Sequence, residues 1–367
     1  MSTSNEKKRK APFRYTGSEE VPKDVESVEF APGVTEVPDG AFEHCTALKY
    51  LQFNLGLQKI GNAAFRGCKS LDFVQFPSTI IEIGENAFFN CQTLKYLGLN
   101  EGLQEIRKYS FYECESLEIV QNPSTVVEIG GYAFYHCAAL KHLVFNKGLQ
   151  IIGDGAFGDC VNLDSIEIPS TVVEIGHGAF SGCCELRNLV FKEGLETIGE
   201  EAFRICESLE FVQFPSTVVE IGNSAFFGCS ALRNLVFKEG LEKIGEEAFK
   251  ECECLEFVQF PSTVLDIGIS AFSGCNRLCK LFLNEGLQAI GVDTFLNCES
   301  LEVLQLPSTI VEIEYGAFLR CRNLSEVFLN KGLQKIWSHA FSRCAIECIA
   351  IPSTVVEIGD EWCICTL

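Results

Sequence analysis

Phenylalanine recurs at a fixed interval of 23 residues along almost the whole chain. It occupies positions 42, 65, 88, 111, 134, 157, 180, 203, 226, 249, 272, 295, 318 and 341. A cysteine follows each phenylalanine after three residues, and a leucine follows after three more. Only the last repeat, which is one residue short, lacks this leucine, and there we expect Ile346 to replace it. Fourteen recurrences at one interval indicate a repeat protein whose units bury their apolar faces against one another.

Within one repeat, the apolar residues change from helical spacing to strand spacing. Between Ala87 and Leu94 they fall on one face of a helical turn. Leu97 and Leu99 then alternate with polar or small residues, as in a strand. The following Ser-Thr-Val-Val or Gly-Leu stretch is β-branched in half of the repeats and indicates a second short strand. Two strands and a return path every 23 residues predict a solenoid with parallel strands.

The repeats alternate between two kinds, which gives a second period of 46 residues. Pro-type repeats carry Pro-Ser-Thr after the strand, at Pro77, Pro123, Pro169, Pro215, Pro261, Pro307 and Pro352. Gly-type repeats carry a glycine two positions further along, at Gly56, Gly102, Gly148, Gly194, Gly240, Gly286 and Gly332. Both residues favour a turn out of the strand, because proline fixes φ and glycine permits positive φ.

The sequence predicts one folded domain after a short tail. We expect residues 1–20 to be a disordered polar and basic tail, and residues 21–367 to form a single solenoid. The solenoid would begin with a capping strand at about residues 25–30, continue through fourteen 23-residue repeats and finish in a truncated end at 360–367.

From about Val25 to Gly359, the pattern I-G-x-x-A-F-x-x-C-x-x-L-x-x-[VL]-x-[FLI]-P resembles the BspA-like leucine-rich repeats. The resemblance implies a right-handed superhelical solenoid. Its parallel β-sheet would be concave, with short helical turns or short strands on the convex side. The resemblance also implies protein binding or adhesion, and the better-known bacterial members are cell-surface proteins. It supplies no catalytic residues.

The strand pattern predicts which side chains form the concave surface, because successive residues of a strand point to opposite faces. The residues on either side of the central Val or Leu are aromatic, aliphatic or amide-bearing, and few are charged. A large apolar surface usually marks an interaction site, although side chains that merely pack sideways along the sheet would give the same pattern. We expect a protein or peptide partner to be bound by Tyr50, Gln52, Phe73, Gln75, Tyr96, Gln121, Val190, Phe211, Gln213, Val236, Phe257, Gln259, Phe282, Gln305 and Phe328.

Fourteen of the 20 cysteines belong to the repeat, and three interpretations compete for them. They are a stack of small buried side chains, a series of disulfides, or metal ligands. Each of these cysteines has two equivalent neighbours, so disulfides would have no unique pairing, and metal sites need clustered ligands. We favour buried free thiols. The others, Cys184, Cys254, Cys279, Cys348, Cys363 and Cys365, follow no regular spacing, and the last two are candidates for reactive thiols.

Nothing in the sequence predicts catalysis or a cofactor. The five histidines occupy different repeat positions, and no nucleophile, base and orienting group recur together. The net charge of −21 opposes nucleic-acid binding. We therefore expect a monomeric, non-catalytic scaffold without cofactor or metal.

The sequence also gives expectations about location. We find no signal peptide and no apolar stretch long enough to insert into a membrane. A cytoplasmic location follows, or a nuclear one if Lys7-Lys8-Arg9-Lys10 acts as a localisation signal and not only as a solvated tail. The alternative is an adhesive cell-surface protein exported by another route.

Overall fold

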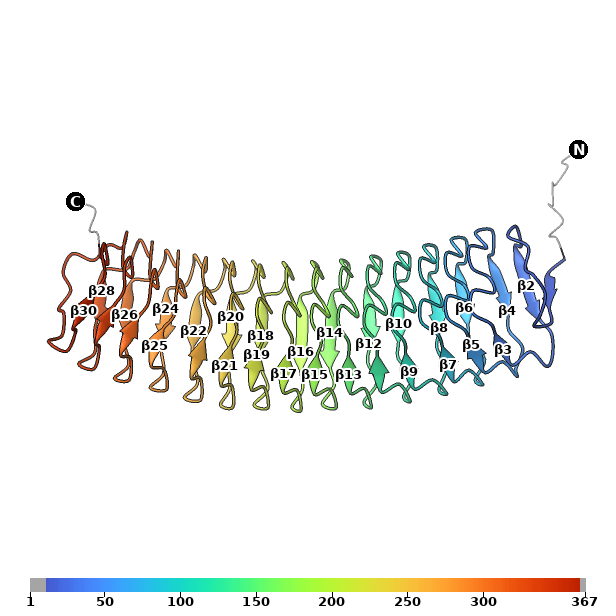
Figure 1. Ribbon diagram of the computed structural model, residues 1–367, viewed down its shortest axis with the longest axis horizontal. Helices are drawn as coiled ribbons and strands as arrows, with labels where there is room; N and C mark the ends of the chain where they lie inside the picture. The colour runs from blue at the N-terminus through green and yellow to red at the C-terminus, as the bar shows by residue number, and fades with distance from the viewer. Residues whose placement is uncertain (1–10, 364–367) are drawn as a thin grey trace, which may run out of the picture.

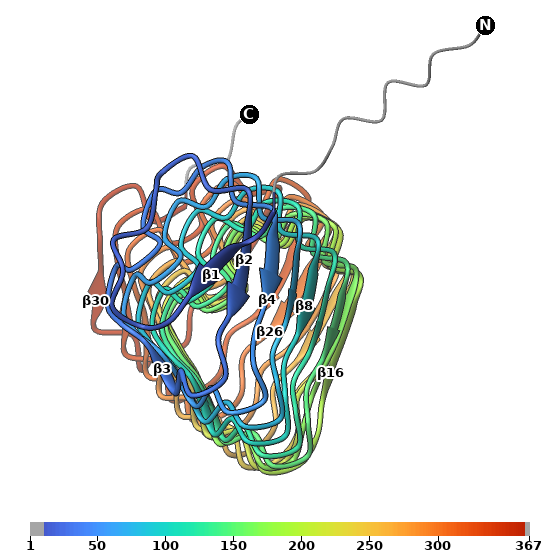
Figure 2. The ribbon, with the colours of Figure 1, turned by 90° about the vertical axis from the view of Figure 1, so that its right-hand side faces the viewer.

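The computed structural model describes residues 11–363, which form a long stack of parallel β-coils (Figure 1). Seen along the stack, each coil has a longer strand on one side, a shorter strand on the other, and turns between them (Figure 2). All strand pairs are parallel, and residues 23 positions apart pair in most coils, for example Phe211 with Asn234. The predicted solenoid is therefore confirmed.

The longer strands have three or four residues each. They are β1 (Phe13–Tyr15), β2 (Ser27–Phe30), β4 (Tyr50–Gln52), β6 (Phe73–Gln75), β8 (Tyr96–Gly98), β10 (Ile119–Gln121), β12 (His142–Val144), β14 (Ser165–Ile168), β16 (Asn188–Phe191), β18 (Phe211–Gln213), β20 (Asn234–Val236), β22 (Phe257–Gln259), β24 (Lys280–Phe282), β26 (Val303–Gln305) and β28 (Glu326–Phe328). Eight of them, β10 to β24, form one continuous sheet.

The shorter strands have two residues each. They are β3 (Glu36–Val37), β5 (Lys59–Ile60), β7 (Glu82–Ile83), β9 (Glu105–Ile106), β11 (Glu128–Ile129), β13 (Ile151–Ile152), β15 (Glu174–Ile175), β17 (Thr197–Ile198), β19 (Glu220–Ile221), β21 (Lys243–Ile244), β23 (Asp266–Ile267), β25 (Ala289–Ile290), β27 (Glu312–Ile313), β29 (Lys335–Ile336) and β30 (Glu357–Ile358). The predicted second strand exists, but it begins just after the Ser-Thr-Val-Val stretch.

The segment around each repeat phenylalanine consists of turns, so the predicted helical turn is wrong. No helix occurs between residues 11 and 363. In every coil the residues two before and two after the phenylalanine have positive φ, such as Asn86 at 57° and Asn90 at 58° around Phe88. A helix cannot continue through left-handed residues. The segment bonds to the next coil instead, since the N–H of Phe88 donates to the carbonyl oxygen of Ser110 over 2.8 Å.

The fourteen repeat phenylalanines form a continuous stack of rings through the core. All are fully buried. Successive ring centroids lie 5.0–5.7 Å apart, with interplanar angles of 4–16°. Stacked aromatic rings contribute beyond the burial of their area, so this column connects every coil to both of its neighbours.

The repeat cysteines form a second buried column beside the phenylalanines. From Cys68 to Cys344, each Sγ donates a hydrogen bond to the carbonyl oxygen of the phenylalanine 26 residues earlier, such as Cys206 to Phe180 over 3.4 Å. Burial raises the pKa of the twelve thiols from Cys68 to Cys321, and that of Cys229 to about 12. The free-thiol interpretation therefore has a structural basis that the sequence did not indicate, because the thiol is a hydrogen-bond donor as well as a small apolar group.

The two ends of the described chain differ from the expectations. Strand β1 lies within the segment expected to be a disordered tail, and it pairs in parallel with β2. The strand predicted at about residues 25–30 is present as β2, but among the described residues β1 precedes it, so β2 does not cap the stack. Tyr15 packs against Phe30 and Phe42 at ring distances of 5.4 and 5.1 Å, which explains why this segment folds. The basic run of residues 7–10 and Cys365 lie outside the described residues.

At the other end, Ile346 is buried, as predicted for the residue that replaces the leucine of the last repeat. Trp362 packs edge-on against Phe341, with the ring centroids 6.4 Å apart.

The stack bends gently, and the sheet of longer strands lies on the outer side of the bend. In Figure 2, β16 in the middle of the chain lies further outward than β4 and β26 nearer the ends. The expectation of a concave sheet therefore does not hold. A helix about 10 Å wide spreads coils apart, whereas strands lie about 4.8 Å apart. With no helix opposite the sheet among the described residues, nothing spreads the coils on that side.

A glycine follows eleven of the fifteen short strands and allows adjacent coils to approach closely. A Cβ on Gly222 would lie 2.6 Å from the amide nitrogen of Glu200 in the preceding coil. Gly291 has more room, because a Cβ there would lie 3.3 Å from the carbonyl oxygen of Ile267. The short-strand sheet is interrupted at this point, between β23 and β25.

We expect Gly222→Ala to lower the free energy of unfolding by about 1–3 kcal/mol, because backbone must move to admit the methyl group. Gly291→Ala is the matched control and should cost less than Gly222→Ala. Urea unfolding of both variants measures the difference. Equal losses would show that conformational freedom, and not close approach, selects glycine at this position.

Carboxylates join four of the seven Gly-type coils to the Pro-type coils that follow them. Glu193 accepts hydrogen bonds from the backbone N–H and the hydroxyl of Ser216, each over 2.9 Å. The hydroxyl of Ser216 lowers the pKa of Glu193. The same pair of bonds links Glu101 to Ser124, Glu239 to Ser262, and Glu285 to Ser308.

Candidate interaction surface

The outward side chains of the longer strands form one continuous surface, which we call the long-strand face. It consists of the first and third residues of each longer strand from β4 to β28. All fifteen residues predicted to bind a partner lie on it. Fourteen of them are exposed and Phe257 is half-buried. The largest side chains remain about half exposed, with values of 48% for Phe73, 45% for Phe211 and 56% for Phe328.

Some aromatic side chains of the long-strand face pack along the stack, and others do not. Phe73 and Tyr96 stack with their ring centroids 4.8 Å apart, and the Tyr96 hydroxyl donates to Oε1 of Gln75 over 3.3 Å. Phe211 instead lies in register between Asn188 and Asn234. Sideways packing therefore covers part of each ring but leaves the face apolar, as both interpretations of the sequence required.

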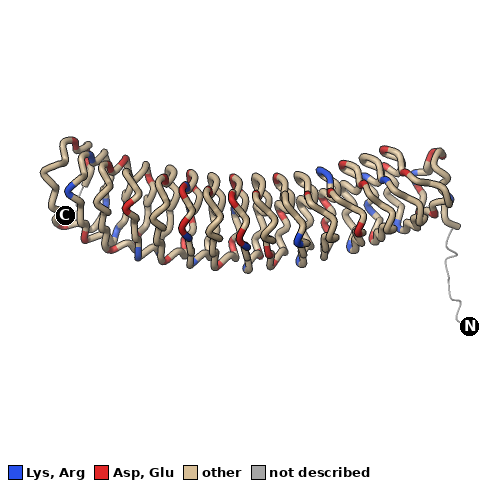
Figure 3. Tube along the Cα trace, turned by 90° about the horizontal axis from the view of Figure 1, so that it is seen from below, with Lys and Arg blue, Asp and Glu red and all other residues tan. Residues whose placement is uncertain are grey.

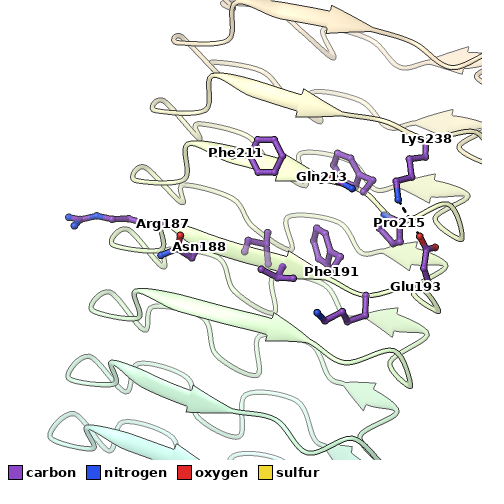
Figure 4. A pocket seen from close by; sticks show the side chains of 12 residues that line it. Arg187, Asn188, Phe191, Glu193, Phe211, Gln213, Pro215 and Lys238 are labelled. Atoms are coloured by element: carbon purple, nitrogen blue, oxygen red, sulfur yellow. Dashed lines mark hydrogen bonds and ion pairs between the residues drawn. The ribbon is translucent and has the colours of Figure 1, made fainter.

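Shallow hollows interrupt the long-strand face where a short side chain follows a longer one. The hollow over β16 and β18 has a volume of about 450 Å³ and is shown in Figure 4. Its apolar lining includes Val190, Phe211 and Pro215, and Gln213 supplies a carboxamide. Similar hollows lie over β8 and β10, over β20 and β22, and over β24 and β26. The sequence does not predict these hollows, because their depth depends on the conformations of neighbouring side chains.

The hollow over β16 and β18 has cations at both ends of an apolar floor. Arg187 directly precedes β16 and Lys192 directly follows it. Lys238, which comes after β20, lies at the opposite end of the hollow from Arg187 (Figure 4). Lys238 Nζ is 3.3 Å from Glu193 Oε1. Arg187 pairs with Glu185 over 2.8 Å. Charged residues of both signs also occur along the stack as a whole (Figure 3).

A second exposed row, on the side of the short strands, was not predicted. It consists of Ile81, Val127, Val173, Val219 and Leu265, the aliphatic residues just before the short strands of five successive Pro-type coils. Their exposed fractions range from 42% to 61%. The signal in the sequence was the recurrence of an aliphatic residue after Thr-Val or Thr-Ile every 46 residues. Strand propensity alone explains β-branched residues there, so this row is a weaker candidate for binding.

The described residues show neither a group of potential metal ligands nor a membrane-spanning helix. Within residues 11–363, no three His, Cys, Asp or Glu side chains are placed to hold a metal ion. The same residues contain no helix long and apolar enough to cross a membrane. Of the cysteines outside the repeat pattern, Cys279 and Cys348 are exposed, and Cys363 is half-buried.

Comparison with known proteins agrees with the repeat pattern. The model of the BspA type leucine rich repeat region, which spans six copies, matches residues 22–141, 127–256 and 242–363. A leucine-rich repeat protein from Bacteroides ovatus is 25% identical over 83% of this chain and 87% of its own, with a TM-score of 0.66. No functionally curated protein matches the sequence.

Two further solved structures share the repeat with lower structural similarity. A leucine rich cell surface protein from Faecalibacterium prausnitzii is 27% identical over 83% of both chains, with a TM-score of 0.46. The T. pallidum leucine rich repeat protein is 25% identical over 68% of this chain and 80% of its own, with a TM-score of 0.31. Since the family model covers nearly all of the described residues, the chain belongs to the family of BspA type leucine rich repeats.

Proposed function

We propose that this chain is a non-catalytic scaffold that binds a protein or peptide on its long-strand face. The observation that carries the proposal is a row of longer strands on which large apolar side chains stay about half exposed, from Tyr50 at 51% to Phe328 at 56%. Monomeric proteins rarely expose apolar patches of this extent unless they bind something. Tyrosine and phenylalanine are also enriched where proteins meet.

The middle of the long-strand face is the part best suited to anchor a partner. Phe211 and Phe257 lie two coils apart, and each has a glutamine two residues further along the same strand, Gln213 and Gln259. Large apolar anchors beside a hydrogen-bonding group are typical of the residues that dominate binding energy. The fully buried phenylalanine column lies beneath the sheet, so the surface rings can be changed without opening the core.

The variant Phe211→Ser with Phe257→Ser should lose affinity for its partner and keep its melting temperature. Each anchor removed should cost about 1–3 kcal/mol of binding, which corresponds to about a 5- to 150-fold loss. Capture of partners from the organism's own extract, quantified by mass spectrometry against the wild type, measures this.

The control variant is Glu200→Ser with Glu246→Ser, two exposed residues beside the short strands. It should keep the partners. If this variant loses them while the phenylalanine variant retains them, binding has been assigned to the wrong side of the stack. The cytoplasmic location stays a prediction of the sequence, and labelling of the protein by biotinylation of intact cells would contradict it.

A further inference from the structure

Two successive pairs of coils in the middle of the stack present the same residues on the long-strand face. Residues 186–196 and 232–242 both read LRNLVFKEGLE, and residues 209–218 and 255–264 both read LEFVQFPSTV. The hollow over β16 and β18 therefore has a counterpart over β20 and β22, lined by Val236, Lys238, Phe257 and Gln259. The two copies are related by a shift of two coils along the stack.

These two copies differ from the other Gly-type coils at one position. Elsewhere it is an asparagine whose Nδ2 donates to backbone carbonyl oxygens of the preceding coil, as in Asn54, Asn100, Asn146, Asn284 and Asn330. In the two copies it is Lys192 or Lys238. A lysine gives up the asparagine's bonds to the backbone and places an ammonium group at the edge of each hollow.

The turns after these lysines also have their own conformation. Gly194 and Gly240 have φ of 123° and 117°, and their N–H groups donate to the hydroxyls of Thr217 and Thr263. In an asparagine coil, the N–H of Gly148 donates to Oδ1 of Asn146 instead. The bond to threonine thus replaces the one that asparagine would supply, so the lysine side chains remain available on the surface.

The spacing of the two copies matches one conformation of an extended peptide. Parallel strands lie about 4.8 Å apart, so Lys192 and Lys238, like Gln213 and Gln259, are separated by about 9.6 Å along the stack. In a polyproline II helix, side chains return to the same side after three residues, about 9.3 Å. A β-strand repeats after about 6.8 Å and would not match both copies.

Taken together, the geometry points to an acidic polyproline II peptide, lying along the stack with a carboxylate at every third residue, as the occupant of both hollows. This inference rests on the proposed function and names the class of partner. The carboxylates would pair with Lys192 and Lys238. Apolar residues would contact Val190 and Phe211, and Gln213 would bond to the peptide backbone, which makes no internal hydrogen bonds in this conformation.

The lysines already have acidic neighbours, but these exposed pairs are weak. Lys192 Nζ lies 3.2 Å from Glu167 Oε1, and Lys238 Nζ lies 3.3 Å from Glu193 Oε1. Exposed ion pairs contribute about 0–1 kcal/mol. Glu193 is also bonded to Ser216 through its other oxygen. A peptide carboxylate can therefore compete with Glu167 and Glu193 for the two lysines, because the peptide also gains apolar contacts in the hollow.

The test uses fluorescence anisotropy with the full chain and a labelled peptide of about five Pro-Pro-Glu repeats. We expect saturable binding that weakens as salt is added, because the charges are exposed. Peptides with glutamine or lysine in place of glutamate should bind at least about fivefold more weakly. A peptide of the same composition with irregularly spaced glutamates should also bind more weakly than the regular Pro-Pro-Glu peptide.

The decisive variant is Lys192→Asn with Lys238→Asn, which introduces the residue found in the other coils and should fold normally. We expect an affinity at least about fivefold lower. The matched control is Lys147→Asn with Lys331→Asn, which removes two exposed lysines one position further along the same turn in other Gly-type coils. The control should bind like the wild type.

Three results would overturn the inference. The first is that the lysine double variant and its control bind the Pro-Pro-Glu peptide with equal affinity. The second is that the peptide with irregularly spaced glutamates binds as tightly as the regular one. The third is that polyglucuronate, an acidic polysaccharide, binds more tightly than the peptide. If none of the peptides binds while Phe211→Ser with Phe257→Ser still loses its natural partner, the proposed function stands and only this inference fails. If the phenylalanine variant keeps its partner, the proposed function itself fails.

Discussion

Raising the pH from about 8 to about 10.5 should unfold the protein, because the buried thiols cannot ionise in the folded state. Desolvation raises the pKa of Cys206 and its neighbours in the column well above the ordinary value of 9.0. In the unfolded chain the same thiols ionise near their ordinary pKa. Their contribution to stability is therefore fully present below about pH 9 and is lost as the pH rises toward the pKa of the folded state.

The expected effect is large because the thiols are numerous. Above the pKa of the unfolded chain, each thiol lowers the free energy of unfolding by about 1.4 kcal/mol per pH unit. Cys68 to Cys321 are twelve such thiols, all with a raised pKa. If the stack unfolds as one unit, the loss exceeds about 10 kcal/mol per pH unit, comparable with the whole stability of an ordinary domain.

Circular dichroism in urea at a series of pH values measures this slope. A variant with Cys160, Cys183, Cys206 and Cys229 replaced by serine should have a slope about one third smaller, because the hydroxyl donates to the same carbonyl but does not titrate here. In the wild type, a thiol reagent should modify the column only after unfolding. A free energy of unfolding that stays constant over this pH range would contradict the assigned burial of the column.

Replacing Phe203 with alanine should lower the free energy of unfolding by about 3–5 kcal/mol. The ring lies between Phe180 and Phe226, with centroid distances of 5.4 and 5.2 Å, and meets the edge of Phe191 at 5.8 Å. Coils on both sides fix the backbone by hydrogen bonds, so the space left by the ring cannot collapse. Thermal and urea unfolding of the variant, followed by circular dichroism, give the loss.

Phe341→Ala is the matched control, because this ring stacks on Phe318 at 5.4 Å and meets only the edge of Trp362 on its other side. It should affect the main unfolding transition less, since the last described coils can open locally without the rest of the stack. Equal losses at the two positions would contradict a structure in which each coil depends mainly on its neighbours.

The sequence predicted the fold well because the same few apolar positions recur in every repeat. The interval of 23 residues indicated which side chains stack, and alternation in the longer strands indicated which ones face outward. The turns around Phe88 were mistaken for helix, since residues spaced by three and four share a face in both structures. The positive φ at Asn86 and Asn90 distinguishes these turns from a helix. In other repeats the equivalent positions hold residues such as Tyr109 and Ile205, whose residue types do not indicate a turn.

The candidate surface was predicted in composition but not in shape. Strand alternation was sufficient to place Phe211 and Gln213 outward. The direction of the bend was predicted wrongly. It depends on the relative widths of the two sides of each coil, and these widths cannot be inferred from any single residue. Lys192 and Lys238 stand out only when the repeats are compared position by position. Their role at the hollows is indicated only by the hydrogen bonds that asparagine makes at this position in the other Gly-type coils.

The bonds between Glu193 and Ser216 have a consequence for how a chain of this kind changes length during evolution. They connect a Gly-type coil to the Pro-type coil after it, and the same arrangement recurs at Glu239 and Ser262. Loss or gain of one 23-residue unit would bring two coils of one kind together and leave a carboxylate or a serine without its counterpart. Duplication or deletion of 46 residues keeps the alternation of the two kinds of coil, so changes in steps of two coils conserve these junctions wherever the glutamate is present.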